Sequence, residues 1–528
     1  MTKVRLVLVL AIAAIASIAL SACGSSSDSG GGSGEDATII RGTTDQPISY
    51  DPAGAYDLPS YDGIYSMYQN LLTVEPGGNK AVPEAAEKCD FTDSKNMVFE
   101  CTIKDGITFS DGSDLTAEDV AFSFNRNIEI ADPNGASSLL ANVKSIKATD
   151  DMTVEFQLKA PDATFPLLLT TGSFAIVPSD VYPEDKLQPS DEVVGSGRYT
   201  EAEYEPGQQT VMEKSDSYTG DSPAKNGRVI TQYFDKAAPL KLAVENGDVD
   251  IAYRSLSPTD IDDLDGAEGL NVVSGNGTEI RYLVFNTDLQ PGTSDEQKTA
   301  IRQAAAQVID RQSIADNVYN GTVQPLYSMV PQGVEYANTA FADEYGEGPD
   351  VDAAKQTLED AGVDTPVPLE IWWTPSHYGT SSGDEYAEIK RQLDDSGLFD
   401  VTLKSTEWNQ YSTAAFTDKY PAYQLGWFPD YPDADDYSSP FYAPDSFLNT
   451  HYDNPAMDKA LADEKASDDP ATREKDFAEI EKIGAEDVPV IPIWQADQVA
   501  AVRDGISGVD ETFDPSFIFR YWLISKDS

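Results

Sequence analysis

Residues 81–126 read AVPEAAEKCDFTDSKNMVFECTIKDGITFSDGSDLTAEDVAFSFNR and predict a hairpin followed by an amphipathic helix. The segment 92–96 has the composition of a turn. After it, apolar and polar side chains alternate over 99–104, which indicates a strand with one buried face. Thr116 and Asp119 then have the spacing of a capping box, so a helix should begin here. Apolar side chains recur beyond it at helical spacing, at Ala117, Val120, Ala121 and Phe124.

Two cysteines, Cys89 and Cys101, lie on either side of the predicted turn. In a hairpin they would oppose each other across the two strands, and export from the cell would favour a disulfide. The alternative is a pair of reduced, buried thiols. A bridge that closes so short a loop would add about 3 kcal/mol in the chain-entropy account.

The N-terminus has the features of an export signal with a lipid-attachment site. Two basic residues precede an apolar run at 6–20, which is too short and too rich in alanine for a comfortable membrane span. The sequence LSAC at 20–23 resembles a bacterial lipobox, in which the cysteine accepts a diacylglycerol. We therefore expect a signal peptide at 1–22, a lipidated Cys23 and a flexible Gly/Ser-rich tether at 23–36. The alternative is an ordinary secretory signal with a chance cysteine.

Composition narrows the class of protein. The chain has 528 residues, too many for one ordinary core, so two or three lobes are expected. Hydrophobic residues make up 40% of the chain and mean hydropathy is −0.38, which excludes a polytopic membrane protein. With 36 Lys and Arg against 91 Asp and Glu, the formal charge is −55. Nucleic acid is a very poor partner for such a chain, because phosphate binding needs clustered cations. The acidity indicates a soluble, exposed surface.

Short strands and amphipathic helices alternate along the rest of the chain without a regular repeat. Strand-like runs occupy 282–285, 369–373 and 490–494. A helix over 352–361 should end at Gly362. Helical spacing of apolar residues also occurs at Ile301, Ala304, Ala305 and Val308. The fold class is therefore α/β, or mixed α+β, with several lobes.

The 81–126 stretch is similar to the signature block of the dipeptide/oligopeptide/nickel family of ABC-transporter solute-binding proteins. Its core runs from Lys104 to Gly112, continues into the helix start and ends at Arg126. Further blocks resemble the family in the same order, although Ser196 and Arg198 stand where Thr and Pro are usual. These blocks are VGSGRY (194–199), LAVENGDVDI (242–251), YLVFN (282–286), IRQA (301–304), IDR (309–311) and WFPDYPD (427–433). Between the last two, Ala354-Lys355, Leu358 and Ala361-Gly362 also match the family. The resemblance covers nearly all of the chain after the tether.

The resemblance implies a type II periplasmic-binding-protein-like fold with three lobes. Lobe I should be discontinuous and lobes II and III continuous, with a small-molecule ligand held between lobes I and III by hinge closure. The expected ranges are 37–75, 188–280 and 491–528 for lobe I, 76–187 for lobe II and 281–490 for lobe III. Proteins of this kind do no chemistry and hand the ligand to the permease subunits of the importer. We expect a monomer, anchored by its lipid on the outer face of the cell membrane.

The resemblance also suggests which residues touch the ligand. It places Asp430 at the family's Trp-x-x-Asp position, where peptide-binding members pair the Asp with the α-amine of the peptide, and Trp427 matches the tryptophan. Ala434 and Pro429 depart from the usual residues and leave the pocket's shape open. The other expected ligand-binding residues are Gly426, Tyr431, Trp408, Tyr411 and Asp45.

Other functions are weighed against peptide capture. Catalysis is poorly supported, because the chain has two His, His377 and His451, and lacks nucleophile-elbow, zinc-protease and phosphate-loop motifs. Paired carboxylates of a glycosidase would have to come from the acidic run at 430–436. No cofactor and no metal site are expected, since nitrogen and sulfur ligands are scarce. A saccharide is the second candidate ligand, and an adhesin or surface receptor with the same fold is a further alternative.

Overall fold

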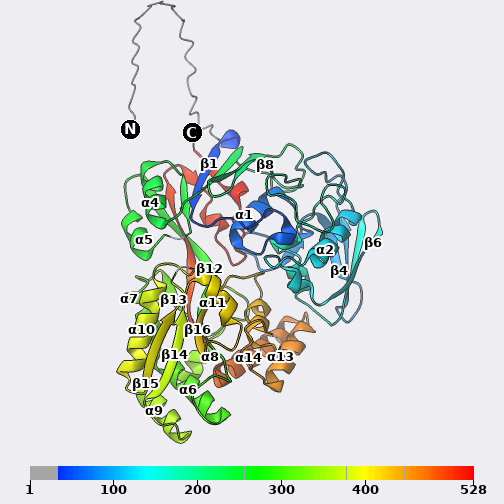
Figure 1. Ribbon diagram of the computed structural model, residues 1–528. Coiled ribbons are helices and arrows are strands. Elements are labelled where there is room, and N and C mark those ends of the chain that lie inside the picture. The colour runs from blue at the N-terminus through cyan, green and yellow to red at the C-terminus, as the bar shows by residue number, and fades with distance from the viewer. Residues whose placement is uncertain (1–33, 255, 376, 445, 528) are drawn as a thin grey trace, which may run out of the picture.

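The computed structural model describes residues 34–254, 256–375, 377–444 and 446–527. The expected signal peptide, Cys23 and most of the tether lie outside these residues. Figure 1 shows two upper bodies and one lower body, and long strands run from the upper-left body into the lower one. Among the described residues, no helix is both long and apolar enough to cross a bilayer.

One large mixed sheet runs through the upper-left and the lower bodies. At its centre, β12 (Leu270–Phe285) pairs antiparallel with β17 (Val490–Arg503). The strand order from the lower to the upper end is β15 (Phe399–Ser405), β14 (Val367–Trp373), β16 (Ala422–Trp427), β12, β17, β11 (Ile251–Tyr253), β1 (Thr38–Thr43), β10 (Arg228–Tyr233), β9 (Gln209–Lys214) and β8 (Tyr199–Glu205), with β13 (Val323–Pro325) also paired to β17. The strands therefore form one group above and one below, and β12 and β17 belong to both groups.

The β12–β17 ladder is interrupted where it passes between the two groups. Its register shifts between Gly275 and Glu279. A Cβ atom at Gly277 would lie 2.1 Å from the carbonyl oxygen of Ala496, so only glycine fits this close approach of the two strands. A break in the ladder between two rigid groups of strands is where a hinge can bend.

The upper-right body contains a second, antiparallel sheet. Its strands follow the order β4 (Ala86–Phe91), β5 (Val98–Ile103), β7 (Thr153–Leu158) and β6 (Val143–Asp150). Helix α2 (Ala117–Ile130) packs against β6 and β7. The Thr116 amide and hydroxyl both donate to the Asp119 carboxylate, at 2.9 and 2.8 Å. The hairpin and the capped helix predicted from 81–126 are therefore confirmed.

The other described elements complete the three bodies. The helices are α1 (Leu58–Met67), α3 (Phe165–Leu168), α4 (Ala237–Asn246), α5 (Pro258–Leu264), α6 (Asp295–Val308), α7 (Arg311–Asn317), α8 (Ala340–Tyr345), α9 (Val351–Asp360), α10 (Ser382–Asp395), α11 (Trp408–Ala415), α12 (Ser439–Tyr442), α13 (Pro455–Lys465) and α14 (Pro470–Asp487). The short strands are β2 (Leu72–Val74) paired with β3 (Ala81–Pro83), and β18 (Ile506–Ser507) paired with β19 (Ser525–Lys526). Below, lobes I, II and III are names for the residue ranges expected from the sequence, which lie mainly in the upper-left, upper-right and lower bodies of Figure 1.

Lobes I and II are joined by a buried ion pair. Arg126 on α2 donates from Nη1 and Nη2 to the two carboxylate oxygens of Asp51 in lobe I, at 2.8 and 2.6 Å. Both side chains are almost fully buried. The guanidinium also donates to the carbonyls of Pro183 and Lys186, so each partner is held by several hydrogen bonds.

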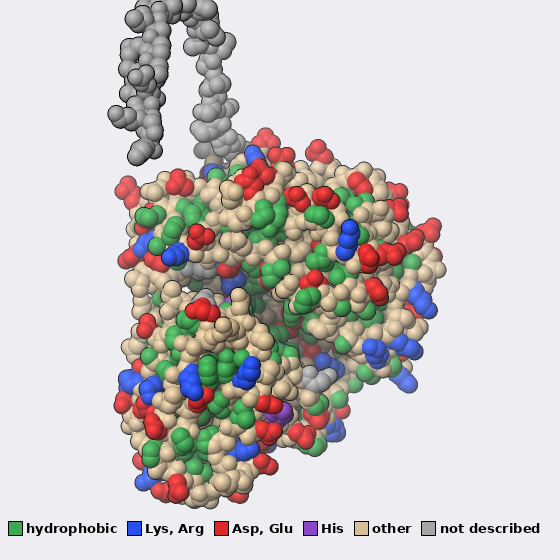
Figure 2. Space-filling view, viewed as in Figure 1, with side chains coloured by type: hydrophobic (Ala, Val, Ile, Leu, Met, Phe, Trp, Pro, Cys, Tyr) green, Lys and Arg blue, Asp and Glu red, His purple; other side chains and the backbone are tan. Residues whose placement is uncertain are grey.

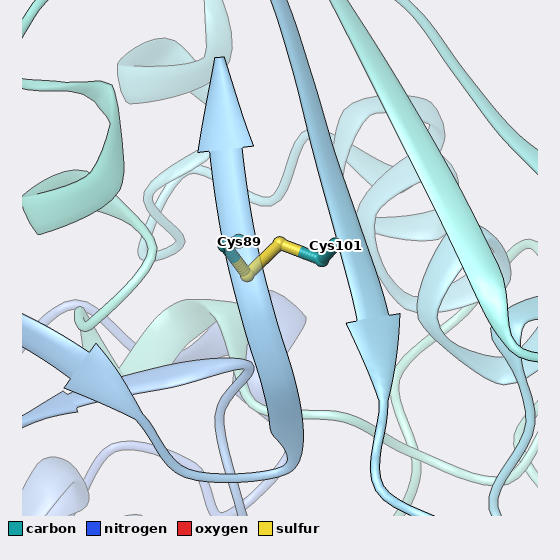
Figure 3. Close-up of a disulfide and its surroundings, with 2 residues drawn as sticks. All are labelled: Cys89 and Cys101. Carbon is teal, nitrogen blue, oxygen red and sulfur yellow. A yellow bond between two sulfur atoms is a disulfide. The ribbon is translucent and has the colours of Figure 1, made fainter. Parts of the chain in front are cut away.

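The disulfide is formed. Cys89 on β4 lies directly opposite Cys101 on β5, with 4.1 Å between their Cα atoms (Figure 3). The bridge closes a loop with a sequence separation of 12 residues. It therefore confirms the predicted pairing and covalently links the two strands of the hairpin in lobe II.

We expect that removing this bridge destabilises lobe II without weakening the ligand site. The double substitution Cys89→Ala/Cys101→Ala should lower the free energy of unfolding by about 3 kcal/mol, because the reduced chain regains loop entropy. Denaturant unfolding followed by circular dichroism measures the loss. Ligand affinity, measured by calorimetry below the unfolding transition, should stay within about twofold. Free-thiol labelling of both cysteines in the native, exported protein would contradict the assignment.

Candidate functional site

The surface is hollowed between lobe III and the two upper lobes (Figure 2). The segment that follows β16, residues 428–436, contacts both upper lobes and is called the junction loop here. The Tyr56 hydroxyl of lobe I donates to Asp430 Oδ2 at 2.8 Å. The Thr171 hydroxyl of lobe II donates to the Asp430 carbonyl oxygen at 3.2 Å. Asp430, in lobe III, is therefore hydrogen-bonded to both upper lobes.

Asp430 and Asp436 form a pair of neighbouring carboxylates. Asp436 is buried, and its Oδ2 accepts the Asp430 backbone N–H at 3.0 Å and the Trp427 indole N–H at 3.1 Å. Burial raises the pKa of Asp430 to about 7, against the opposing effect of the hydrogen bond from Tyr56. Burial, and then the charge of Asp430, raise the pKa of Asp436 well above its usual range. Two carboxylates removed from water next to each other favour a shared proton or an added cation.

The protein supplies cations to the other acids of the junction loop. Asp433 is bound by Arg473, and Asp435 lies 3.4 Å from the ammonium of Lys465. Within the described part of the chain, neither Asp430 nor Asp436 has a Lys, Arg or His at ion-pair distance. The negative charge of this pair is therefore left for a ligand or a proton to compensate.

A second group of charges lies near the junction loop and the hinge. Arg254 pairs with Asp45 at 3.1 Å and lies over the ring of Phe428 at 4.6 Å. Arg281 is buried and paired with Glu279, and its guanidinium is 4.3 Å from the Tyr378 ring. These two arginines and two acids neutralise each other. The unbalanced charge of the site is therefore at Asp430 and Asp436.

The structure brings some of the predicted ligand-binding residues to this junction. Trp427 binds Asp436 through its indole N–H and stacks on Phe447, with ring centres 5.6 Å apart. At Gly426, a Cβ atom would lie 2.3 Å from Arg281 Nη1, so the glycine leaves space for the guanidinium.

Three other residues that were predicted to bind the ligand contact neighbouring parts of the protein. Trp408 stacks on His377 with ring centres 3.6 Å apart. Tyr411 is fully buried, and its hydroxyl donates to backbone carbonyls of Trp372 and Gln424. Tyr431 is buried in the apolar cluster of lobe II. Tyr411 thus supports β14 and β16 from within lobe III.

Sequence reasoning missed Tyr56, Thr171, Arg254 and Arg281. Tyr56 is 374 residues away from Asp430 along the chain, and no local pattern connects the two.

Burial lowers the pKa of His377 to about 4, assisted by the nearby guanidinium of Arg281, so its imidazole is neutral at pH 7. Within the residues described, no group of three or more His, Cys, Asp or Glu side chains is arranged to hold a metal ion.

Comparisons with known proteins cover almost the whole chain. The family model described as "Bacterial extracellular solute-binding proteins, family 5 Middle" matches residues 80–449. The peptide transport periplasmic protein SapA of Salmonella typhimurium is 26% identical over 478 residues, which cover 84% of each chain. The dipeptide-binding protein DppE of Bacillus subtilis is 24% identical, with 90% of each chain covered. The crystal structure of the ABC transporter substrate-binding protein CtaP of Listeria monocytogenes superposes with a TM-score of 0.80 at 23% identity, over 94% of this chain and all of that one.

Proposed function

Because the chain belongs to the bacterial extracellular solute-binding proteins, family 5, we propose that it captures peptides outside the cell and passes them to an ABC importer. Members of this family are transport proteins, so the chain is not an enzyme. The two curated relatives above are named for peptide transport and dipeptide binding. The type II binding-protein fold, predicted from sequence, is also that of the solved relative.

The observation that carries the peptide assignment is the uncompensated carboxylate pair. A peptide α-amine is a cation at neutral pH, and it would supply the charge that Asp430 and Asp436 lack. Inside a closed cleft an ammonium needs a carboxylate, because its hydration is lost there. An oligosaccharide brings no positive charge and would leave both acids uncompensated.

The hinge supports a capture mechanism. Lobe III is joined to lobe I through β12 and β17, whose ladder is broken near Gly277. Ligand binding between the lobes would stabilise the closed form, in which Tyr56 and Thr171 reach Asp430. A ligand shifts such an equilibrium by its difference in affinity for the two forms. The permease would then recognise the closed form.

Calorimetry on the purified protein tests this function. The titrants are tri-alanine, N-acetyl-tri-alanine and a panel of neutral oligosaccharides. We expect binding of tri-alanine and at least tenfold weaker binding of the acetylated peptide, which has no α-ammonium. Tight binding of a sugar with no binding of either peptide would overturn the peptide assignment. Native mass spectrometry of freshly purified protein identifies any ligand that is retained.

We also propose that Cys23 anchors the protein to the membrane by a lipid. In cells, Cys23→Ser should abolish metabolic labelling with a fatty acid and release the protein from the membrane fraction. Both results are expected because the substitution removes the thiol to which the lipid would be attached. Cys89→Ala/Cys101→Ala serves as the control and should remain labelled. An unsubstituted protein that takes up no lipid label would refute the anchor.

A further inference from the structure

We propose that lobe II holds the junction loop in its binding position, through a clasp made by Tyr431 and Lys465 of lobe III with Asp162 and Ala163 of lobe II. The clasp makes lobe II part of the ligand-binding machinery, although the proposed site lies between lobes I and III. The ligand readout of this proposal rests on the proposed function. The interlobe contacts themselves do not depend on it.

Tyr431 is the apolar half of the clasp. It directly follows Asp430, yet its ring is buried in the core cluster of lobe II. The other buried members of that cluster belong to lobe II, except Leu71 and Leu72 at the edge of lobe I. A residue adjacent to the predicted ligand contact is thus fixed by a different lobe. Burial of a tyrosine ring is a substantial apolar contribution, and it is lost whenever lobes II and III separate.

The Tyr431 hydroxyl connects this ring to the acids of lobe III. It donates to Asp435 Oδ2 at 3.0 Å. Asp435 is buried and also accepts the Ser439 hydroxyl. The ring and the hydroxyl of Tyr431 therefore join the core of lobe II to a buried acid of the junction loop.

Lys465 is the polar half of the clasp. Its carbonyl oxygen accepts the backbone N–H of Ala163 at 2.8 Å, a hydrogen bond between lobes III and II. Its ammonium lies 3.4 Å from Asp435 Oδ2. Asp435 first, and Asp162 of lobe II after it, raise the pKa of Lys465, so the ammonium is stabilised by acids from both lobes.

Asp162 is held in place from its own lobe. Its Oδ1 accepts the amide and hydroxyl of Thr164, at 3.1 and 2.7 Å, and Asn142 donates to its other oxygen at 3.3 Å. The carboxylate is buried, and Lys465 opposes the rise in its pKa that burial causes. Opening of the lobes would move this carboxylate away from the Lys465 ammonium and remove their electrostatic interaction.

Both halves of the clasp act on the same backbone. Tyr431 and Asp435 follow Asp430 in the junction loop, and Thr171 of lobe II donates to the Asp430 carbonyl as well. Movement of lobe II away from lobe III would therefore release the loop and displace the Asp430 carboxylate. Tyr431 and Lys465 are positioning residues, since they act on the ligand through Asp430.

Hydrogen–deuterium exchange of the full-length protein without ligand tests the clasp directly. We expect Tyr431→Ala and Lys465→Met to speed exchange at least tenfold in the segments around Ala163 and in the junction loop. Lys465→Met keeps most of the side chain and provides a milder variant if Tyr431→Ala fails to fold. The matched control is Lys459→Met on the same helix, whose ion pair with Asp463 stays within lobe III. It should exchange as the unsubstituted protein does.

Calorimetry with tri-alanine gives the second readout. We expect both clasp variants to bind at least tenfold more weakly, and Lys459→Met to bind within twofold of the unsubstituted protein. Unchanged exchange around Ala163 in the folded variants would overturn the clasp. So would unchanged tri-alanine affinity in variants whose exchange had increased. If the unsubstituted protein binds no peptide but the variants show the faster exchange, the proposed function fails and the interlobe clasp stands.

Discussion

Replacing Asp430 with Asn should weaken tri-alanine binding at least one-hundredfold. The substitution keeps the size of the side chain and removes the charge that would meet the peptide ammonium. A buried charge left without its partner costs several kcal/mol, and two decades of affinity correspond to about 2.8 kcal/mol at 1.4 kcal/mol per decade. Calorimetry on the two proteins measures the ratio. Asp400→Asn, an exposed acid on β15, is the matched control and should bind normally.

The pH dependence of binding provides an independent check on Asp430. Its pKa is raised to about 7 by burial, and an ammonium would bind the ionised form and lower that pKa. Affinity should therefore fall above about pH 8, where the peptide α-amine loses its proton. Below pH 7 it should fall by up to tenfold per unit, as Asp430 takes up a proton. Asp430→Asn should remove this slope. Equal affinity for free and N-acetylated peptides, together with a slope that survives the substitution, would rule out an α-amine contact at Asp430.

The ion pair between Arg126 and Asp51 should have the largest effect on stability. Arg126→Met is expected to lower the free energy of unfolding by about 3–5 kcal/mol, because Asp51 stays buried without its cation. Urea unfolding followed by circular dichroism measures the change. Arg391→Met, at an exposed pair on α10, is the control and should cost less than about 1 kcal/mol.

A companion variant separates loss of the pair from loss of packing. Adding Asp51→Asn to Arg126→Met removes the uncompensated charge and should recover part of the lost stability. If Arg126→Met costs no more than the exposed control, the pair does not fasten lobe I to lobe II.

Local features of the fold could be predicted from the sequence, and distant pairings could not. The hairpin and α2 follow from alternation, helical spacing and a capping box within 46 residues, so their signals are short-range. The pairing of β12 with β17 joins segments about 200 residues apart, and nothing in either sequence identifies the other as its partner strand. The resemblance supplied the fold class instead, and the comparisons confirm it.

The site shows the same limit. The acidic run at 430–436 was visible in the sequence, and the resemblance singled out Asp430, but the sequence did not show which of the four acids have a cation nearby. Arg473 and Lys465 distinguish them in the structure, by compensating Asp433 and Asp435 and not the other two. Those cations lie on α14 and α13, at spacings that no motif specifies. Tyr56 and Thr171 likewise contact Asp430 from other lobes, at sequence separations that no motif specifies.

The position of β17 in the sheet also sets the order in which the protein can assemble. A chain is synthesised from its N-terminus, and β17 begins at Val490, so β17 is made after all its partner strands. Until it is inserted, β11 and β12 have no strand between them, and lobe I is not joined to lobe III through the sheet. Lobe II lies early in the chain, and its four-stranded sheet contains no strand made later than β7, so it can fold before this step. The cleft is therefore completed only after β17 has emerged, and a nascent chain cannot trap a ligand before that step.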